Sequence, residues 1–267
     1  MDHLSAFFPL IPVSTARAAR ALYGRGNLYI RLGDRLNYLA TRFSPEIRLM
    51  HGHDEKSTLL GLLTVIQYVE KLTDVELAEA IQRRMDLRYA VHLATPSVAL
   101  SPWSLCEFRT KILTAPDYHK LFEEMFGLIY AEITSTVTYE KPQIDEVLRS
   151  ICENEIRASL NEAMLRSMEA LSANYFNWLR QVALPHWYQR YNRSLLLLSS
   201  GPSLRKQEPT RDDLQRDLQH LLCAIRSSNS REIMEMQETK DLQFIWEQLT
   251  DATSMNDCDH CVKKLHR

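Results

Sequence analysis

The stretch STLLGLLTVIQYVEKLTDVELAEAIQRRMDLRYAVHL, residues 57–93, decides the fold class of this chain. In its first half, apolar residues occupy nearly every side of the expected helix, which predicts that the helix is buried. Thr73 and Glu76 then form a T-x-x-E capping box, which predicts the start of a second helix that ends near Arg84. A short third helix is expected over 86–93. The stretch therefore indicates a mainly α fold with an N-terminal helical bundle.

The next segment, SPWSLCEFRTKIL (101–113), predicts a further helix, because Ser101 suits the cap position and Pro102 the first turn. The expected buried stripe, at the i, i+3, i+7 spacing, consists of Leu105, Phe108 and Ile112. The residues off that stripe are Ser104, Glu107, Arg109 and Lys111. A short capped helix with small polar and basic residues, following two packed helices, fits a helix-turn-helix-like element.

Towards the N-terminus, Ser14 is expected to cap a helix that runs to about Tyr23. A second helix near 27–43 places its leucines on one side and its arginines elsewhere. Residues 1–48 hold seven Arg against three acidic residues, a net charge of +4, although the whole chain carries −2. A local basic patch of this kind can bind phosphates. A solvated Arg-rich face is the alternative, and composition alone favours it.

After a helix predicted over 117–132, the stretch ITSTVTY (133–139) concentrates β-branched and aromatic residues. Such residues favour an extended strand, so a short extended segment is expected over 133–142, up to Pro142. A second helical region should follow, with a long helix over 143–183 that breaks near Asn174.

The aromatic stretch LPHWYQRY (184–191) is expected to pack on that long helix. A loop over 195–209 and helices over 210–227 and 230–249 complete the second helical region. The predicted domains are 1–132, 133–142, 143–249 and a polar tail, 250–267.

Composition excludes several classes of function. Only 7 Gly are present and no glycine-rich phosphate loop occurs, so nucleotide binding has no motif support. Five Cys without a disulfide spacing fit a reducing cytosol. The longest apolar run, 59–69, is too short to cross a bilayer, so no membrane association is expected. We expect no cofactor and no small-molecule substrate.

Two groups of residues resemble metal sites. A C-x-H-C-x₄-H pattern near the C-terminus contains two thiols and two imidazoles, which are zinc ligands. Its residues are Cys258, His260, Cys261 and His266. The second knuckle of a zinc site is missing, so a tail without metal is the preferred interpretation, with a site shared between two chains as the exception. A second group, HGHDE (51–55), is interpreted as a solvated loop.

Two other groups of residues are not interpreted as functional sites. Ser104 with Cys106 and Glu107 forms no hydrolytic triad, because no His is placed to act as the base. Four aromatic residues of the second helical region could stack bases but are more often core at helical spacing. They are Trp178, Trp187, Tyr188 and Tyr191.

The order of these blocks resembles the N-terminal half of bacterial insertion-sequence transposases of the InsH-like group. The likeness rests on GNLYIRLGDRLNYL (26–39), the stretch 62–93, SLCEFRTKIL (104–113), the stretch 148–191 and, more weakly, LQFIWEQ (242–248). The second and third stretches are fairly specific. The resemblance implies a helical DNA-binding domain, followed by an RNase-H-like catalytic core of the DDE type and a helical insert.

In that family the strand after the long helix bears a D-S-T-H-like motif, whose Asp is the first metal-binding carboxylate. Here Thr134, Ser135, Thr136 and Val137 take its place. Metal-dependent phosphoryl transfer needs anionic oxygen ligands, and a threonine hydroxyl is neutral. The segments expected to carry the other two carboxylates are not present in the sequence. We therefore expect no catalysis, no catalytic residue and no bound metal.

These observations predict a catalytically inactive, transposase-derived protein that binds duplex DNA and is cytoplasmic, at the nucleoid. The residues expected to contact DNA are Arg31, Arg35, Arg83, Arg84, Arg88, Ser104, Arg109 and Lys111. The second hypothesis is a scaffold or interaction subunit of a larger, nucleic-acid-containing complex that docks or dimerises through 143–191. An exposed apolar stripe on that helix would favour the second hypothesis. A continuous positive groove across 83–111 would favour the first.

Overall fold

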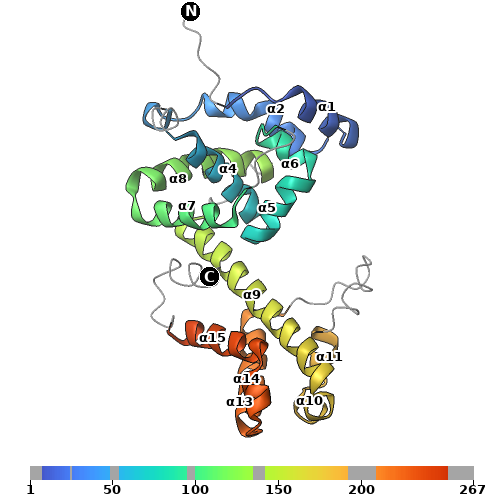
Figure 1. Cartoon of the computed structure of the whole chain (residues 1–267). Helices are drawn as coiled ribbons and strands as arrows, with labels where there is room; N and C mark the ends of the chain where they lie inside the picture. The colour runs from blue at the N-terminus through green and yellow to red at the C-terminus, as the bar shows by residue number, and fades with distance from the viewer. Residues whose placement is uncertain are drawn as a thin grey trace, which may run out of the picture. The chain divides into compact units, whose positions relative to one another are not determined.

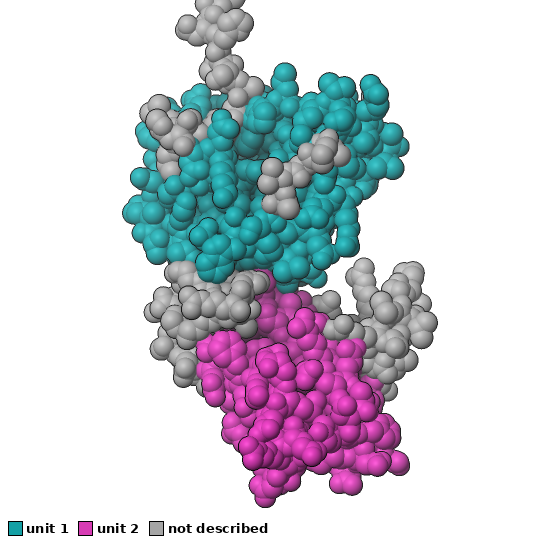
Figure 2. Space-filling view, viewed as in Figure 1, with its two compact units in different colours: residues 1–151 teal, residues 152–267 magenta. Residues whose placement is uncertain are grey.

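The computed structural model describes residues 8–24, 26–48, 54–94, 100–134, 142–191 and 209–251. Those residues are mainly α-helical, which confirms the predicted fold class, and none of them forms a β-strand (Figure 1). The chain divides into two compact units, residues 1–151 and 152–267 (Figure 2). Each unit has its own hydrophobic core, and each is described by itself below.

The first unit begins with α1 (Val13–Leu22) and α2 (Leu28–Ala40). The predicted cap at Ser14 is wrong: α1 starts at Val13 after Pro12, and no side chain caps it. Asn27 caps α2, because its side-chain oxygen accepts hydrogen bonds from the backbone N–H groups of the helix's first turn. The helix thus starts where the sequence placed it.

The predicted three-helix block forms α4 (Glu55–Glu70), α5 (Asp74–Arg83) and α6 (Met85–Ala90). The capping box is confirmed: the Glu76 N–H donates to the Thr73 hydroxyl (3.2 Å), and the Thr73 N–H donates to the Glu76 carboxylate (2.8 Å). Helix α4 is buried over most of its length, as expected from its apolar sequence.

Helices α2 and α6 approach each other closely at Gly33. A Cβ at this position would lie 2.6 Å from the Tyr89 carbonyl oxygen and 2.6 Å from the Tyr89 ring. No real side chain tolerates such contacts, so only glycine allows these two helices to pack at this distance. The close approach fixes α2 against the core and turns its other side outward.

Helices α7 (Pro102–Thr114) and α8 (Pro116–Thr134) complete the helical bundle. The predicted stripe of Leu105, Phe108 and Ile112 is buried. The extended segment expected from residue 133 is wrong for its first two residues, because Ile133 and Thr134 form the last turn of α8. Ile133 is buried in the core, and that packing outweighs the strand preference of a β-branched residue. Residues 135–141 lie outside the described part.

The long helix α9 (Ile144–Asn174) is followed by α10 (Phe176–Val182) and α11 (Trp187–Arg190). The break predicted near Asn174 is confirmed. The first unit continues to Ile151, beyond the boundary predicted at 142, because four apolar residues of the first turns of α9 belong to its core. These residues are Ile144, Val147, Leu148 and Ile151.

The second unit contains the rest of α9, helices α10 and α11, and α13 (Arg211–Ser227), α14 (Arg231–Glu235) and α15 (Gln237–Asp251). The helix expected over 230–249 is therefore two helices that meet at Met236. Trp187 and Tyr191 are buried in the core of this unit. Among the described residues, no helix combines the length and the apolar character needed to cross a membrane.

Candidate nucleic-acid interface

The residue expected to lead the interface, Arg109, is buried. Its guanidinium donates two hydrogen bonds of 2.7 Å to the Asp74 carboxylate at the start of α5. Gln67 of α4 donates to the same carboxylate at 2.7 Å and accepts from Arg109 at 3.2 Å. A side chain held in this way inside the protein cannot reach a DNA groove, so the prediction for Arg109 is wrong.

Arg88 is also buried, and its side chain caps the C-terminal end of α5. Its guanidinium donates to the backbone carbonyl of Ile81 (2.6 Å) and to that of Gln82 (2.7 Å), near the end of α5. Carbonyl groups at a helix C-terminus lack partners within the helix, and a cation satisfies them well. Arg88 therefore stabilises the α5–α6 turn, and the prediction that it holds a phosphate is wrong.

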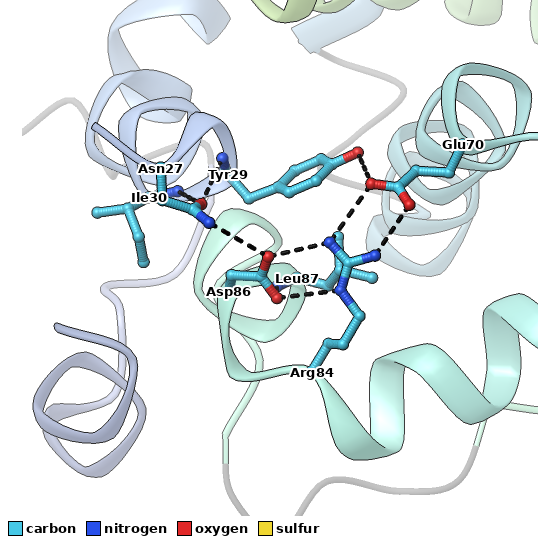
Figure 3. Close-up of polar contacts among 7 residues, drawn as sticks. All are labelled: Asn27, Tyr29, Ile30, Glu70, Arg84, Asp86 and Leu87. Carbon is cyan, nitrogen blue, oxygen red and sulfur yellow. Dashed lines mark hydrogen bonds and ion pairs between the residues drawn. The ribbon is translucent and has the colours of Figure 1, made fainter. Parts of the chain in front are cut away.

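Arg84 lies in the centre of a polar network that joins three parts of the first unit (Figure 3). It forms ion pairs with Glu70 of α4 (2.9 Å) and with Asp86 of α6 (2.9 Å). Tyr29 of α2 donates to Glu70 at 2.6 Å, and the Arg84 guanidinium lies 5.3 Å from the centre of the Tyr29 ring. Asn27 donates to Asp86 at 3.5 Å.

The electrostatics of this network match its geometry. The hydrogen bond to Asp86 and that to Glu70 raise the pKa of Arg84 against the opposing effect of burial. Burial and the hydrogen bond to Glu70 raise the pKa of Tyr29, so its hydroxyl keeps its proton. Two carboxylates therefore hold the Arg84 guanidinium, whose side chain is 33% exposed. The phosphate contact expected at Arg84 stays a prediction.

The rest of the expected 83–111 surface is exposed but carries mixed charge. Arg83 forms an exposed ion pair with Glu79 (3.3 Å). Lys111 is exposed, with its ammonium 5.3 Å from the centre of the Tyr118 ring, and Ser104 is half-buried. The exposed charged residues of α5 and α7 are Glu76, Glu79, Arg83, Glu107 and Lys111. Three acidic and two basic groups do not form the continuous positive groove that the helix-turn-helix hypothesis requires.

Helix α2 presents the expected basic character instead. Arg31, Arg35 and Tyr38 lie at the i, i+4, i+7 spacing, which places them on one side of the helix. Arg42 follows in a turn that continues the helix, since its N–H donates to the Leu39 carbonyl at 3.0 Å. All four side chains are exposed, and Tyr38 is 61% exposed. We call these four residues the α2 stripe.

The α2 stripe is bordered by an acidic residue on each side. Asp34 forms an ion pair with Arg20 of α1 (3.0 Å) and accepts a hydrogen bond from the Tyr89 hydroxyl. On the other side, Glu132 of α8 forms an ion pair with Arg35 (2.8 Å). The Arg35 guanidinium also lies 5.9 Å from the centre of the Tyr38 ring. Ion pairs with α1 and α8 therefore flank the stripe.

The remaining sequence candidates fall in three groups. Thr134 lies in α8 and donates to the Tyr130 carbonyl at 2.8 Å. Several candidates lie outside the described residues: Ser135, Thr136, Cys258, His260, Cys261 and His266. Of the four aromatic residues expected in the core, Trp187 and Tyr191 are buried there and Trp178 packs against it, but Tyr188 is exposed, so the prediction is wrong for Tyr188. Within the described ranges, no group of three or more His, Cys, Asp or Glu side chains is placed to hold a metal ion.

Sequence reasoning missed Tyr38, which was not singled out although it lies between the arginines. The signal was present, because positions 31, 35, 38 and 42 recur at the spacing of one helix face while the leucines of α2 lie on another. The predicted set included Arg31 and Arg35 of α2 together with residues of α5 to α7, but not Tyr38.

Comparisons with protein families, with curated proteins and with solved structures found no match for this chain.

Proposed function

We propose that this chain is a non-catalytic, transposase-derived protein that binds duplex DNA through the α2 stripe of its N-terminal helical unit. The observation that carries the proposal is the α2 stripe itself: two exposed arginines and an exposed tyrosine on one side of α2, with a third exposed arginine, Arg42, in the turn that follows. Guanidinium groups form charge-assisted, bidentate hydrogen bonds with phosphates, and tyrosine hydroxyls also contact the DNA backbone. The stretch 26–39, which contains most of this helix, is one of those on which the resemblance to InsH-like transposases rests.

The absence of catalysis is part of the proposal. The position that would carry the first carboxylate is Thr134, whose neutral hydroxyl donates to the Tyr130 carbonyl within its own helix. A hydroxyl used in this way contributes no negative charge to a divalent cation. This observation supports binding without strand cleavage.

The competing hypothesis is a docking subunit that uses 143–191, and an exposed apolar stripe on the long helix would favour it. The large exposed hydrophobic residues of the described chain include none on α9. Two of them, Phe176 and Tyr188, lie in the shorter helices α10 and α11 and do not form a stripe along one helix. We therefore propose DNA as the partner.

A fluorescence-anisotropy titration of a labelled duplex tests the proposal. The double variant Arg31→Gln/Arg42→Gln removes two cations of the α2 stripe and should weaken binding at least tenfold at low salt. The matched control, Arg83→Gln/Lys111→Gln, removes two exposed cations from α5 and α7 and should leave the affinity within about twofold of the wild type. Circular dichroism and urea unfolding show whether each variant is folded.

Two outcomes would overturn the proposal. One is a wild-type protein that binds no duplex at 50 mM salt. The other is the reverse order of effects, with the α5–α7 control losing affinity and the α2 variant retaining it. Magnesium-dependent cleavage of the duplex by the purified chain would contradict the non-catalytic part alone.

A further inference from the structure

The α2 stripe differs from a groove-reading helix in its surroundings. An α-helix with its side chains is about 10–12 Å across, and the major groove of DNA is about 12 Å wide. The groove therefore admits one helix, and a recognition helix must protrude from its domain to enter it. Side chains of two other helices reach α2 on opposite sides of the stripe. Arg20 of α1 pairs with Asp34 at 3.0 Å, and Glu132 of α8 pairs with Arg35 at 2.8 Å. The surface around the stripe is therefore wider than one helix.

The acidic borders have a second consequence. Asp34 and Glu132 lie beside the stripe, each in an ion pair with an arginine, and their carboxylates lower the positive charge at its borders. Contact with a DNA backbone is therefore most favourable along the length of the stripe. Arg31 and Arg42, the first and last arginines of the stripe, are 11 positions apart, about 16 Å at the helical rise of 1.5 Å per residue. This length suits a few neighbouring phosphates.

The side chains of the stripe also lack the amide groups that read adenine. Arg can read guanine through its O6 and N7 atoms, but only from within the major groove. Tyr38 ends in a single hydroxyl, which suits a phosphate or a sugar. Asn37, the neighbouring amide, is half-buried and accepts a hydrogen bond from the Phe8 N–H at 2.8 Å. No group on the stripe is therefore placed to distinguish one base pair from another.

We infer that the α2 stripe binds duplex DNA irrespective of sequence, through about three phosphates of the backbone and without contacts to base edges. The inference rests on the proposed function and specifies its ligand class. A protein of this kind would have a low affinity for each site and a small footprint.

The salt dependence of the binding constant measures the number of phosphates contacted. Each phosphate neutralised on B-DNA contributes a slope of about −0.9 to the plot of log K against log salt, so three contacts predict about −2.7. The variant Arg42→Gln should reduce the slope to about −1.8, and Arg83→Gln should leave it unchanged. A wild-type slope steeper than about −5 would contradict the inference, because the stripe cannot supply that many contacts.

The second arm tests sequence reading directly. A duplex that contains only A·T pairs should bind within about threefold of a mixed-sequence duplex of equal length. Were an arginine reading guanine, the A·T duplex would lose about 5- to 150-fold, the discrimination typical of one bidentate contact. A loss of that size that disappears in Arg31→Gln or Arg42→Gln overturns the inference and leaves the proposed function standing. A wild-type protein that binds neither duplex overturns both.

Discussion

At the scale of single residues, the pair formed by Arg109 and Asp74 shows how a cation can serve the core of a small helical unit. Both side chains are almost fully buried, with 4% and 0% of their surface exposed. Gln67 completes the cluster with bonds to both partners. Removal of one partner from such a pair leaves a buried charge without compensation, and the cost is larger than the net stabilisation by the intact pair.

The variant Arg109→Ala should therefore destabilise the protein by about 3–5 kcal/mol, because it leaves the Asp74 carboxylate buried and unpaired. Urea unfolding followed by circular dichroism measures the change. The matched control Lys111→Ala removes an exposed cation of the same helix and should change the stability by less than about 0.5 kcal/mol. A loss below about 1 kcal/mol for Arg109→Ala would show that the pair is not buried as described.

The sequence held part of this information. Arg109 lies four residues after Leu105 and one after Phe108, so it occupies the edge of the buried stripe of α7. An arginine at such an edge is either a surface cation or the partner of a buried carboxylate. What decides is Asp74, 35 positions earlier in the chain, and no local pattern in one sequence reveals that contact.

At the scale of elements, helix starts were more predictable than helix ends. The capping box at Thr73 was read from four residues, because capping is a local interaction. The end of α8 was misplaced, because Ile133 has a strand preference but packs into the core of the first unit. The start of α1 was misplaced by two residues, since Pro12, and not Ser14, occupies the cap position. Local capping could be predicted from the sequence, whereas contacts between distant segments could not.

In the second unit, Asp217 of α13 fixes α11. Its carboxylate accepts hydrogen bonds from the Tyr191 hydroxyl (2.7 Å) and from Arg190 (2.5 Å), and His186 lies 3.2 Å away. Burial alone would raise the pKa of Asp217, but the hydrogen bonds, first among them that from Tyr191, outweigh it and hold the pKa below its ordinary value. The folded state thus favours the ionised carboxylate.

A carboxyl group whose pKa is lower in the folded state contributes stability above its unfolded pKa, and this contribution is lost as the pH falls through the folded value. We expect part of the wild-type stability to disappear below about pH 4. Asp217→Asn should lose about 1–3 kcal/mol at pH 7 and should show a shallower further loss in acid. Unfolding curves recorded from pH 7 to pH 2.5 measure both effects.

The control for that experiment is Asp241→Asn, an exposed carboxyl of α15 that accepts a hydrogen bond from Gln237. Its unfolding free energy should follow the wild type at every pH. If Asp217→Asn and wild type lose stability in parallel as the pH falls, Asp217 is not the group responsible for the acid sensitivity of this unit.

At the scale of the whole molecule, the division into two helical regions was predictable, but its boundary was not. The sequence placed the boundary at 142, where Pro142 interrupts the helical pattern, and the first compact unit extends to Ile151. The apolar periodicity of α9 is continuous, so nothing in the local pattern shows that its first turns belong to one core and its later turns to another. The basic region was likewise readable as a net charge of +4 over 1–48, and the spacing of its arginines placed them away from the leucines of α2. The ion pair between Arg35 and Glu132 of α8 required the fold.

The central claim is that DNA binds on α2 and not on α5–α7. An arginine-selective dicarbonyl reagent, applied with and without bound duplex and followed by peptide mass spectrometry, tests this location directly. We predict that bound duplex slows the chemical modification of Arg31 and Arg42 several-fold and leaves the rate for exposed Arg83 unchanged. Protection of Arg83 with unchanged modification of Arg31 and Arg42 would contradict it.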